Sequence, residues 1–280
     1  MAPALLRRAA PSPIVKWVGG KTKLLDELTA RAPKPYRRYF EPFLGGGALF
    51  FRLRPPAAVL SDRNEALIEC YRAVRDEVDD VIHALARHRT RHGRDYYYQV
   101  REAWNAGMRE ATGAERAATF VYLNKTCYNG LWRVNSRGAF NVPMGRYERP
   151  SILDAAALRI AARALHGHDL HARSFEAIVD EAGAGDFVYF DPPYVPAGET
   201  ADFTSYTPGR FGLREQQRLA EAFRELADRG CAVMLSNSDT PIVRRLYAGF
   251  RIDRVWCARA VNSRADRRGE VAEVIVRNRY

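Results

Sequence analysis

Cysteine is scarce in this chain, and its few cysteines stand apart. They are Cys70, Cys127, Cys231 and Cys257, and no two of them have the spacing of metal ligands. Zinc centres draw on clustered Cys and His side chains, so the sequence argues against a zinc site and against zinc-dependent deaminase chemistry. We therefore expect no metal, and reduced thiols as in a cytoplasmic protein.

The chain also begins without a long apolar run. Residues 1–11 hold only short apolar stretches among arginines and prolines, too short for a signal peptide or a membrane helix. We expect a cytoplasmic protein that does not contact a membrane and is a monomer in solution.

The sequence has fewer acidic than basic residues. The 33 acidic residues face 44 Lys and Arg, which gives a formal charge of +11 at pH 7. Such an excess favours a polyanionic partner, although arginine-rich chains also arise from genome composition alone. Between residues 116 and 150 only Glu148 opposes a set of six basic residues: Arg116, Lys125, Arg133, Arg137, Arg146 and Arg149. This stretch is the first candidate for contacts with nucleic acid.

A phosphate-binding fingerprint near the N-terminal end of the sequence is incomplete. Gly19-Gly20-Lys21-Thr22 has the end of a phosphate-binding loop, but Val15 stands where that loop needs its first glycine, which excludes a nucleoside triphosphatase. Trp17, just before this turn, is either a core or capping residue or a plate on which a ring could stack. Lys21 could offer a positive charge to a cofactor carboxylate.

The most informative motif is Asp191-Pro192-Pro193-Tyr194. It follows the apolar run 187–190, which is typical of a buried strand, so the carboxylate is expected at a strand end, where open α/β sheets bind ligands. Prolines cannot extend a ladder, and main-chain carbonyls are left unpaired. Asp191 and the Pro192 carbonyl could thus accept both hydrogens of an exocyclic amine while Tyr194 stacks on the ring. The alternative is an ordinary strand-ending turn.

A second motif suggests an adenosine site. Residues 39–51 run from an apolar strand through Gly45-Gly46-Gly47 into an apolar helix, although without the full G-x-G-x-x-G pattern. The next short strand, 58–62, ends in Asp62, about 20 residues past the glycines, where an acid can bind ribose hydroxyls. The pattern does not separate a dinucleotide from S-adenosylmethionine.

In this order and spacing the motifs resemble the Dam-type (class α) DNA adenine-N6 methyltransferases. The similarity covers nearly the whole chain and extends to further short motifs, at residues 60–64, 122–124, 128–131, 140–143, 145–147 and 236–237. The resemblance implies a bacterial or phage enzyme, associated with the nucleoid through DNA, that transfers methyl from S-adenosylmethionine to the N6 of adenine in duplex DNA. A base inside a duplex must flip out to reach such a pocket, and the transfer is expected to be direct and in line, without metal.

The resemblance also assigns residues. It implies a cofactor pocket formed by Trp17, Gly19, Lys21, Glu41, Phe43, Gly45, Gly47, Asp62, Phe175 and Asp191. It implies that Asp191, Pro192, Pro193 and Tyr194 hold the target base. Phe175 comes from the family alone, and it would otherwise pass as a core residue.

For DNA, the segment 133–142 has turn residues between two short strand candidates and predicts a β-hairpin, which suits the major groove. By resemblance, Arg133 reads guanine in a GATC target, and Tyr128 and Asn129 intrude beside the flipped adenine. The remaining expected DNA contacts are Lys16 with a base, Leu131 and Pro143 with thymine, and Lys125, Arg137 and Arg146 with phosphates. Trp132 and Val134 depart from the family pattern.

The fold class expected from these elements is α/β: a Rossmann-like methyltransferase fold with a mostly parallel sheet, plus a helical insert that bears the hairpin. We expect the catalytic core at residues 1–64 and 151–280 and the target-recognition insert at 65–150. Residues 213–228 have helical spacing, Gly230 ends that helix, and 231–235 form the next strand.

Other functions share parts of the pattern. An RNA or protein methyltransferase would share the cofactor site, but a basic hairpin insert favours duplex DNA. A dinucleotide oxidoreductase would leave Asp-Pro-Pro-Tyr without a role. A catalytically silent DNA-binding module would keep the insert and lose the need for Asp191.

Overall fold

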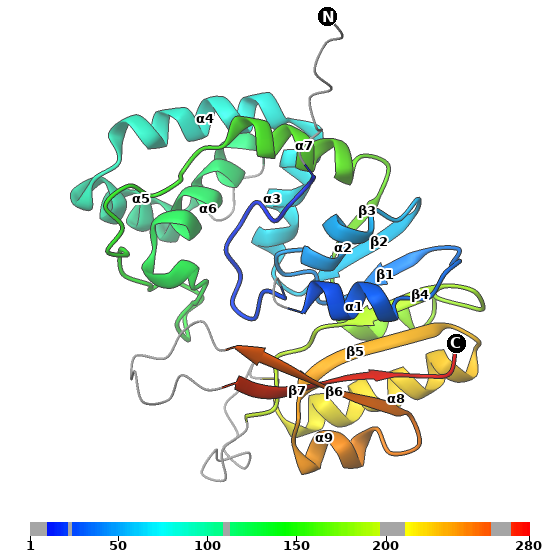
Figure 1. The fold of residues 1–280 in the computed structure, drawn as a ribbon. Coiled ribbons are helices and arrows are strands. Elements are labelled where there is room, and N and C mark those ends of the chain that lie inside the picture. The colour runs from blue at the N-terminus through cyan, green and yellow to red at the C-terminus, as the bar shows by residue number, and fades with distance from the viewer. Residues whose placement is uncertain (1–9, 22–23, 109–112, 197–210, 259–269) are drawn as a thin grey trace, which may run out of the picture. The chain divides into compact units, whose positions relative to one another are not determined.

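The computed structural model describes residues 10–21, 24–108, 113–196, 211–258 and 270–280. The chain forms two compact units, and Figure 1 shows the helices and strands that belong to them. The first unit comprises residues 1–20, 45–54 and 64–172, and the second comprises 21–44, 55–63 and 173–280. The expected division into a core and an insert at 65–150 concerns function and remains a prediction.

The sheet has seven strands in the order β3-β2-β1-β4-β5-β7-β6. Their bounds are β1 Tyr39–Glu41, β2 Ala58–Asp62, β3 Asp169–Ala172, β4 Phe187–Phe190, β5 Ala232–Ser238, β6 Arg251–Ala258 and β7 Glu270–Arg277. Strand β1 pairs in parallel with β2 and β4, and β4 pairs in parallel with β5. Strand β7 is antiparallel to β5 and β6. The prediction of a mostly parallel α/β sheet is confirmed.

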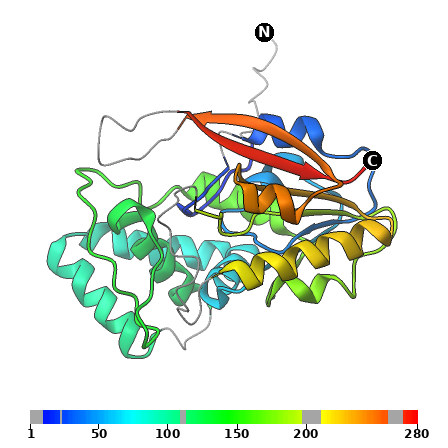
Figure 2. The same cartoon turned by 90° about the horizontal axis from the view of Figure 1, so that it is seen from below.

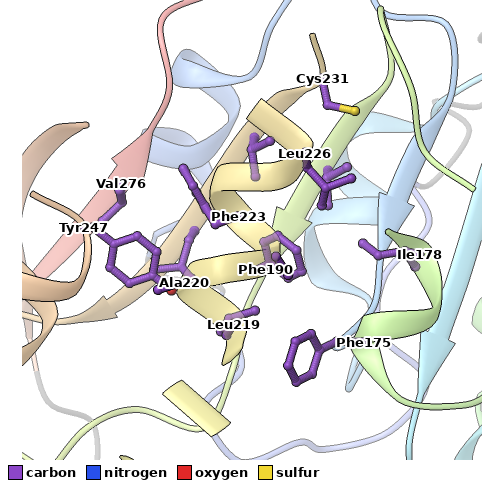
Figure 3. Packing of buried hydrophobic residues seen from close by; sticks show 14 of the residues in the cluster. Phe175, Ile178, Phe190, Leu219, Ala220, Phe223, Leu226, Cys231, Tyr247 and Val276 are labelled. Atoms are coloured by element: carbon purple, nitrogen blue, oxygen red, sulfur yellow. The ribbon is translucent and has the colours of Figure 1, made fainter. Parts of the chain in front are cut away.

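The second unit owes its core to one face of this sheet. Helix α8 (Leu213–Asp228), at the bounds that its apolar spacing predicts, buries Leu219, Phe223 and Leu226. Figure 3 shows these side chains beside Phe190 of β4 and Tyr247, which follows α9 (Pro241–Leu246). Figure 2 shows α8 and α9 side by side. The unit also contains α1 (Leu25–Arg31) and the short 3₁₀ helix η3 (Phe175–Ile178).

The first unit is built around helix α6 (Ala114–Thr126). Ten of its 13 residues are buried, so it is enclosed on all sides and has little amphipathic character. Its neighbours are α3 (Glu65–Asp76), α4 (Val78–Arg91) and α5 (Arg94–Ala106). The unit further includes α2 (Ala48–Leu53), the 3₁₀ turn η2 (Tyr128–Gly130) and α7 (Ala155–Leu165). Helices thus fill most of the described part of residues 65–130, as expected for a helical insert.

The hairpin expected at 133–142 is present in reduced form. Val134 and Phe140 make a single antiparallel bridge, and Asn135 N donates to the Ala139 carbonyl across the turn at 2.9 Å. Helix α5 bonds the outer edge of the returning limb, whose backbone groups at Phe140 and Val142 point away from Val134. Asn105 bonds both the N–H and the carbonyl of Phe140, and Tyr97 donates to the Val142 carbonyl.

Candidate active site

Asp191 lies at the carboxyl end of β4, as its sequence position predicts. All four residues of β4 are buried, and their register with β5 pairs Phe190 with Leu235. The next positions on the two chains, Asp191 and Ser236, are therefore neighbours across the strands. The prolines at 192 and 193 then turn the chain out of the sheet.

Two side chains contact the Asp191 carboxylate, both at Oδ1. The Lys21 ammonium lies 2.6 Å from this oxygen, and the Ser236 hydroxyl donates to it at 3.1 Å. Burial raises the pKa of Asp191, while the charge of Lys21 and the bonds from Lys21 and Ser236 act in the opposite direction. Among the described residues no other group bonds to Asp191, which makes Oδ2 the oxygen available to a ligand.

A buried tyrosine, Tyr189, forms a hydrogen bond with Ser236 in turn. The Tyr189 hydroxyl lies 2.9 Å from Ser236 Oγ. Because a serine has one hydrogen and Ser236 gives it to a carboxylate, Tyr189 must be the donor of this bond. The resulting chain runs from Tyr189 through Ser236 to Asp191. Sequence reasoning assigned no role to these two hydroxyls; the available signal was that Ser236 directly follows the apolar run 231–235, as Asp191 follows the run 187–190.

The loop after Asp191 is held from two sides. Gln216 of α8 donates to the Pro193 carbonyl at 2.8 Å, and the Asn237 side chain accepts from Val195 N at 3.1 Å. In the described part of the chain no hydrogen bond reaches the Pro192 carbonyl. One of the carbonyls that the prolines were expected to leave unpaired is therefore unpaired, whereas that of Pro193 is not.

Tyr194 is held at its hydroxyl and over the face of its ring. Its hydroxyl donates to Glu273 at 2.8 Å, and the Lys21 ammonium lies 4.4 Å from the ring centroid. Burial, and then the nearby charge of Asp191, raises the pKa of Tyr194 well above its ordinary value. The side chain is therefore a neutral aromatic plate beside Asp191.

Four more expected cofactor residues belong to this unit. Glu41 ends β1, is 3% exposed and accepts from the Tyr39 hydroxyl at 2.9 Å. Asp62 ends β2 as predicted and is partly exposed. Phe43 stacks on Phe175 with ring centroids 5.5 Å apart. Phe175 itself is 2% exposed and belongs to the core cluster, so its local environment is that of a packing residue.

The other expected cofactor residues lie in the first unit, where Trp17 packs on the glycine turn. A Cβ on Gly45 would come within 2.6 Å of the Trp17 ring. Gly45 and Gly47 both have positive φ, +47° and +65°, which favours glycine at these positions. Gly19 makes the tight turn after Trp17, with Gly20 N donating to the Trp17 carbonyl. A backbone this bare can approach a nucleoside closely, which fits an adenosine cofactor.

The expected DNA-contacting residues also lie in the first unit. Six are exposed: Tyr128, Asn129, Arg133, Arg137, Pro143 and Arg146; the other three, Lys16, Lys125 and Leu131, are partly buried. The structure brings the two ends of the loop together, since Tyr128 N donates to the Pro143 carbonyl at 2.9 Å. Burial lowers the pKa of Lys125, with the charge of Lys16 acting the same way.

Of the two departures in the recognition segment, Trp132 has a structural reason. Trp132 turns inward, where its ring packs on Phe120 and Phe140 at centroid distances of 4.0 and 4.6 Å. This inward packing leaves Arg133 exposed, and Arg133 Nε bonds Asn141 across the turn at 2.9 Å. Val134 is 49% exposed. Trp132 therefore acts as a packing residue of the helical unit.

The described residues give no sign of a metal centre or a membrane segment. Among them, no three His, Cys, Asp or Glu side chains gather as metal ligands. No described helix has the length and apolar character to cross a bilayer. Cys70, Cys127 and Cys231 are free and buried, and burial raises the pKa of Cys70 to about 12.

Comparison with known proteins gives a consistent result. Residues 17–261 match the family model of the D12 class N6 adenine-specific DNA methyltransferases. The chain is 42% identical over 269 residues to the type II methyltransferase M1.LlaDCHI of Lactococcus lactis subsp. cremoris, covering 95% of each. It is 39% identical to the type II methyltransferase M.MjaIII of Methanocaldococcus jannaschii, over 95% of this chain and 98% of the relative.

A third relative is the DNA adenine methylase of Escherichia coli K12. It is 35% identical over 263 residues, which cover 93% of both chains. A family match over most of the chain, together with full-length relatives above 30% identity, identifies the protein's class. This chain belongs to the D12 class of N6 adenine-specific DNA methyltransferases.

Proposed function

We propose that this enzyme methylates the N6 of an adenine flipped out of duplex DNA, within GATC, using S-adenosylmethionine. One observation carries the proposal. Lys21 and Ser236 both occupy Oδ1 of Asp191, while Oδ2 and the Pro192 carbonyl have no hydrogen bond among the described residues. Two acceptors beside the Tyr194 ring suit an aromatic amine with two N–H groups.

The residues that we propose for cofactor binding offer several kinds of contact. Asp62 at the end of β2 suits the ribose hydroxyls, and Phe43 offers an aromatic face. Trp17 and the glycine turn at 45–47 offer a stacking plate and a close backbone approach. S-adenosylmethionine supplies a methyl group on a positively charged sulfur, which needs no metal for its transfer.

The protein's task at the amine is positioning. Accepting both N–H hydrogens at Asp191 and Pro192 draws the nitrogen lone pair out of the purine ring system and directs it away from these acceptors. Preorganised acceptors of this kind stabilise the positive charge that develops on nitrogen as its bond to the methyl carbon forms. Lys21 favours the ionised, accepting form of Asp191, because its positive charge opposes the rise in pKa that burial causes.

Flipping is proposed because a stacked base cannot reach such acceptors. Tyr128, half exposed at the start of η2, offers an aromatic ring that could fill the space left in the duplex. Asn129 beside it has φ +53°, and such strained backbone is found at functional sites.

The GATC target is proposed from the recognition turn. Arg133 is exposed on the turn and oriented by Asn141, and an oriented guanidinium can bond two acceptors of guanine. The E. coli relative is named a DNA adenine methylase, whereas two others are named type II methyltransferases. Because the names differ, they do not assign a biological role to the methylation that we propose.

A digestion assay tests the function and its target. Plasmid prepared from a methylase-free host that expresses the chain should resist an enzyme blocked by methylated GATC and be cut by one that requires it. The same plasmid from cells with Asp191→Ala should show the reverse. Persistent cutting by the blocked enzyme would reject GATC, and mapping of methylated adenines across the genome would then show the true target or none.

A further inference from the structure

Asn124, near the end of α6, is a fully buried side chain whose hydrogen-bonding groups reach two distant backbone segments. Its Oδ1 accepts from Lys16 N at 2.8 Å, and its Nδ2 donates to the Lys16 carbonyl at 2.7 Å and to the Gly130 carbonyl at 3.1 Å. Both N–H hydrogens of the amide are thus used. The Lys16 pair fixes the amide's orientation, because an N–H must face oxygen and a carbonyl must face nitrogen.

One of these segments belongs to the expected cofactor side. Lys16 is followed by Trp17, whose ring lies against the glycine turn so closely that a Cβ on Gly45 would meet it at 2.6 Å. The Gly45 carbonyl in turn accepts from the Tyr71 hydroxyl of α3 at 3.0 Å. A shift of segment 16–17 would therefore displace the glycine turn at 45–47.

The other segment belongs to the expected DNA side. Gly130 closes the turn that carries Tyr128 and Asn129, and its φ is +65°. Lys16 packs directly on it, since a Cβ on Gly130 would lie 2.3 Å from Lys16 Cβ. The Lys16 ammonium also reaches the Lys125 carbonyl at 3.4 Å. Segment 16–17 is therefore attached to the 128–130 turn by hydrogen bonds and by packing.

We propose that Asn124 is a positioning residue that couples DNA binding at the 128–130 turn to cofactor binding at Trp17 and the glycine turn. When bound DNA fixes the conformation of the 128–130 turn, the hydrogen bonds of Asn124 also fix the position of segment 16–17. The cofactor then binds a segment that is already ordered. Linkage requires the reverse as well, so bound cofactor strengthens DNA binding by the same factor. This inference rests on the proposed function, which supplies the two ligands.

The test is the effect of DNA on cofactor affinity. S-adenosylhomocysteine, which cannot be turned over, is titrated into the full chain by calorimetry with and without a saturating GATC duplex. In the wild-type protein the duplex should raise the affinity about fivefold or more, the usual lower bound of allosteric coupling. Asn124→Leu keeps the volume but removes all three bonds, and the ratio should fall towards one.

Asn105→Leu is the matched control. Asn105 makes the same two-way amide pair, with Phe140 N at 2.8 Å and the Phe140 carbonyl at 3.0 Å, and supports the returning limb of the recognition turn. Its bonds do not involve segment 16–17. The control should weaken DNA binding while leaving the ratio of affinities at the wild-type value.

Gly130→Ala provides a second, independent variant. It leaves Asn124 in place but forces a methyl group against Lys16, so it should also reduce the ratio if Asn124→Leu does not fold. A wild-type ratio of one, an unchanged ratio in Asn124→Leu or Gly130→Ala, or an equal loss in Asn105→Leu would overturn the inference. Failure of the wild-type chain to bind either ligand would instead reject the proposed function.

Discussion

Lys21 and Asp191 form a largely buried ion pair, with 9% and 19% of their side chains exposed and 2.6 Å between the ammonium and Oδ1. A buried carboxylate needs compensation, and this one receives it at one oxygen only. The ion pair thus makes the two oxygens of Asp191 unequal. Oδ1 is anchored to the protein, and Oδ2 is left to a ligand.

Replacing Asp191 with asparagine should slow turnover strongly and spare binding. The amide has nearly the same shape, but it brings a donor where two acceptors are needed. We expect kcat to fall about 100- to 1,000-fold, the range for loss of one preorganised transition-state partner. Labelled-methyl transfer to a GATC duplex measures it. Asp76→Asn, which alters an exposed pair with Arg75, serves as the control.

Replacing Lys21 with methionine should move the acidic limb of the pH–rate profile upward. Burial raises the pKa of Asp191 and Lys21 lowers it, so removal of the ammonium leaves the carboxyl protonated to a higher pH. The ionised acceptor is lost as pH falls through this pKa. Single-turnover rates between pH 5 and 9 would show the shift, and Lys21→Arg, which keeps the charge, should show less of it. An unmoved limb would mean that another group sets it.

The hydroxyl chain behind Asp191 should matter for kcat more than for KM. Ser236→Ala removes a hydrogen bond to a charged group, worth about 1.5–3 kcal/mol, so kcat should drop about 10- to 100-fold. Tyr189→Phe removes only the donor to Ser236 and should cost less. The double variant should be little worse than Ser236→Ala, because both act along one path. Additive losses would show that the two hydroxyls act independently.

Sequence patterns predict the elements of this protein well and its long-range contacts poorly. The apolar spacing of 213–228 and the run 187–190 give α8 and β4 at the observed bounds, because local periodicity reflects one buried face. The contact between Ser236 and Asp191 depends on strand register, and that between Asn124 and Lys16 spans 108 positions. No local pattern encodes either. The bonds from Asn105 and Tyr97 to the returning limb of the hairpin likewise join segments that are far apart in the chain.

Asp186 should control the acid stability of the second unit. Burial alone would raise the pKa of this fully buried carboxyl, but bonds from Arg37, Arg38 and Gly183 N outweigh burial and lower it. Its stabilising contribution is therefore complete above its unfolded pKa and is lost as pH falls through the folded value. Asp186→Asn should lower the free energy of unfolding by about 1.5–3 kcal/mol at pH 7, because it weakens charge-assisted hydrogen bonds whose arginine partners are partly exposed. In urea titrations this difference should shrink at acidic pH, and a constant difference would contradict the assignment.

Substitutions of Arg133 and Arg137 should have different effects on sequence selection and on DNA binding. Arg133 is held by Asn141 in a geometry suited to two bonds with guanine, whereas Arg137 is an exposed arginine of the same turn. Arg133→Lys should cost about 1–3 kcal/mol in kcat/KM on GATC and relax selection at one base pair, because a lysine cannot make the forked contact. Arg137→Ala should weaken binding to all duplexes alike and reduce the salt dependence of binding by about one phosphate contact. Methylation of single-substitution GATC duplexes, with binding measured at several salt concentrations, separates the two. If Arg133→Lys lowered activity on every sequence equally, the guanine contact would have to be sought elsewhere on the turn.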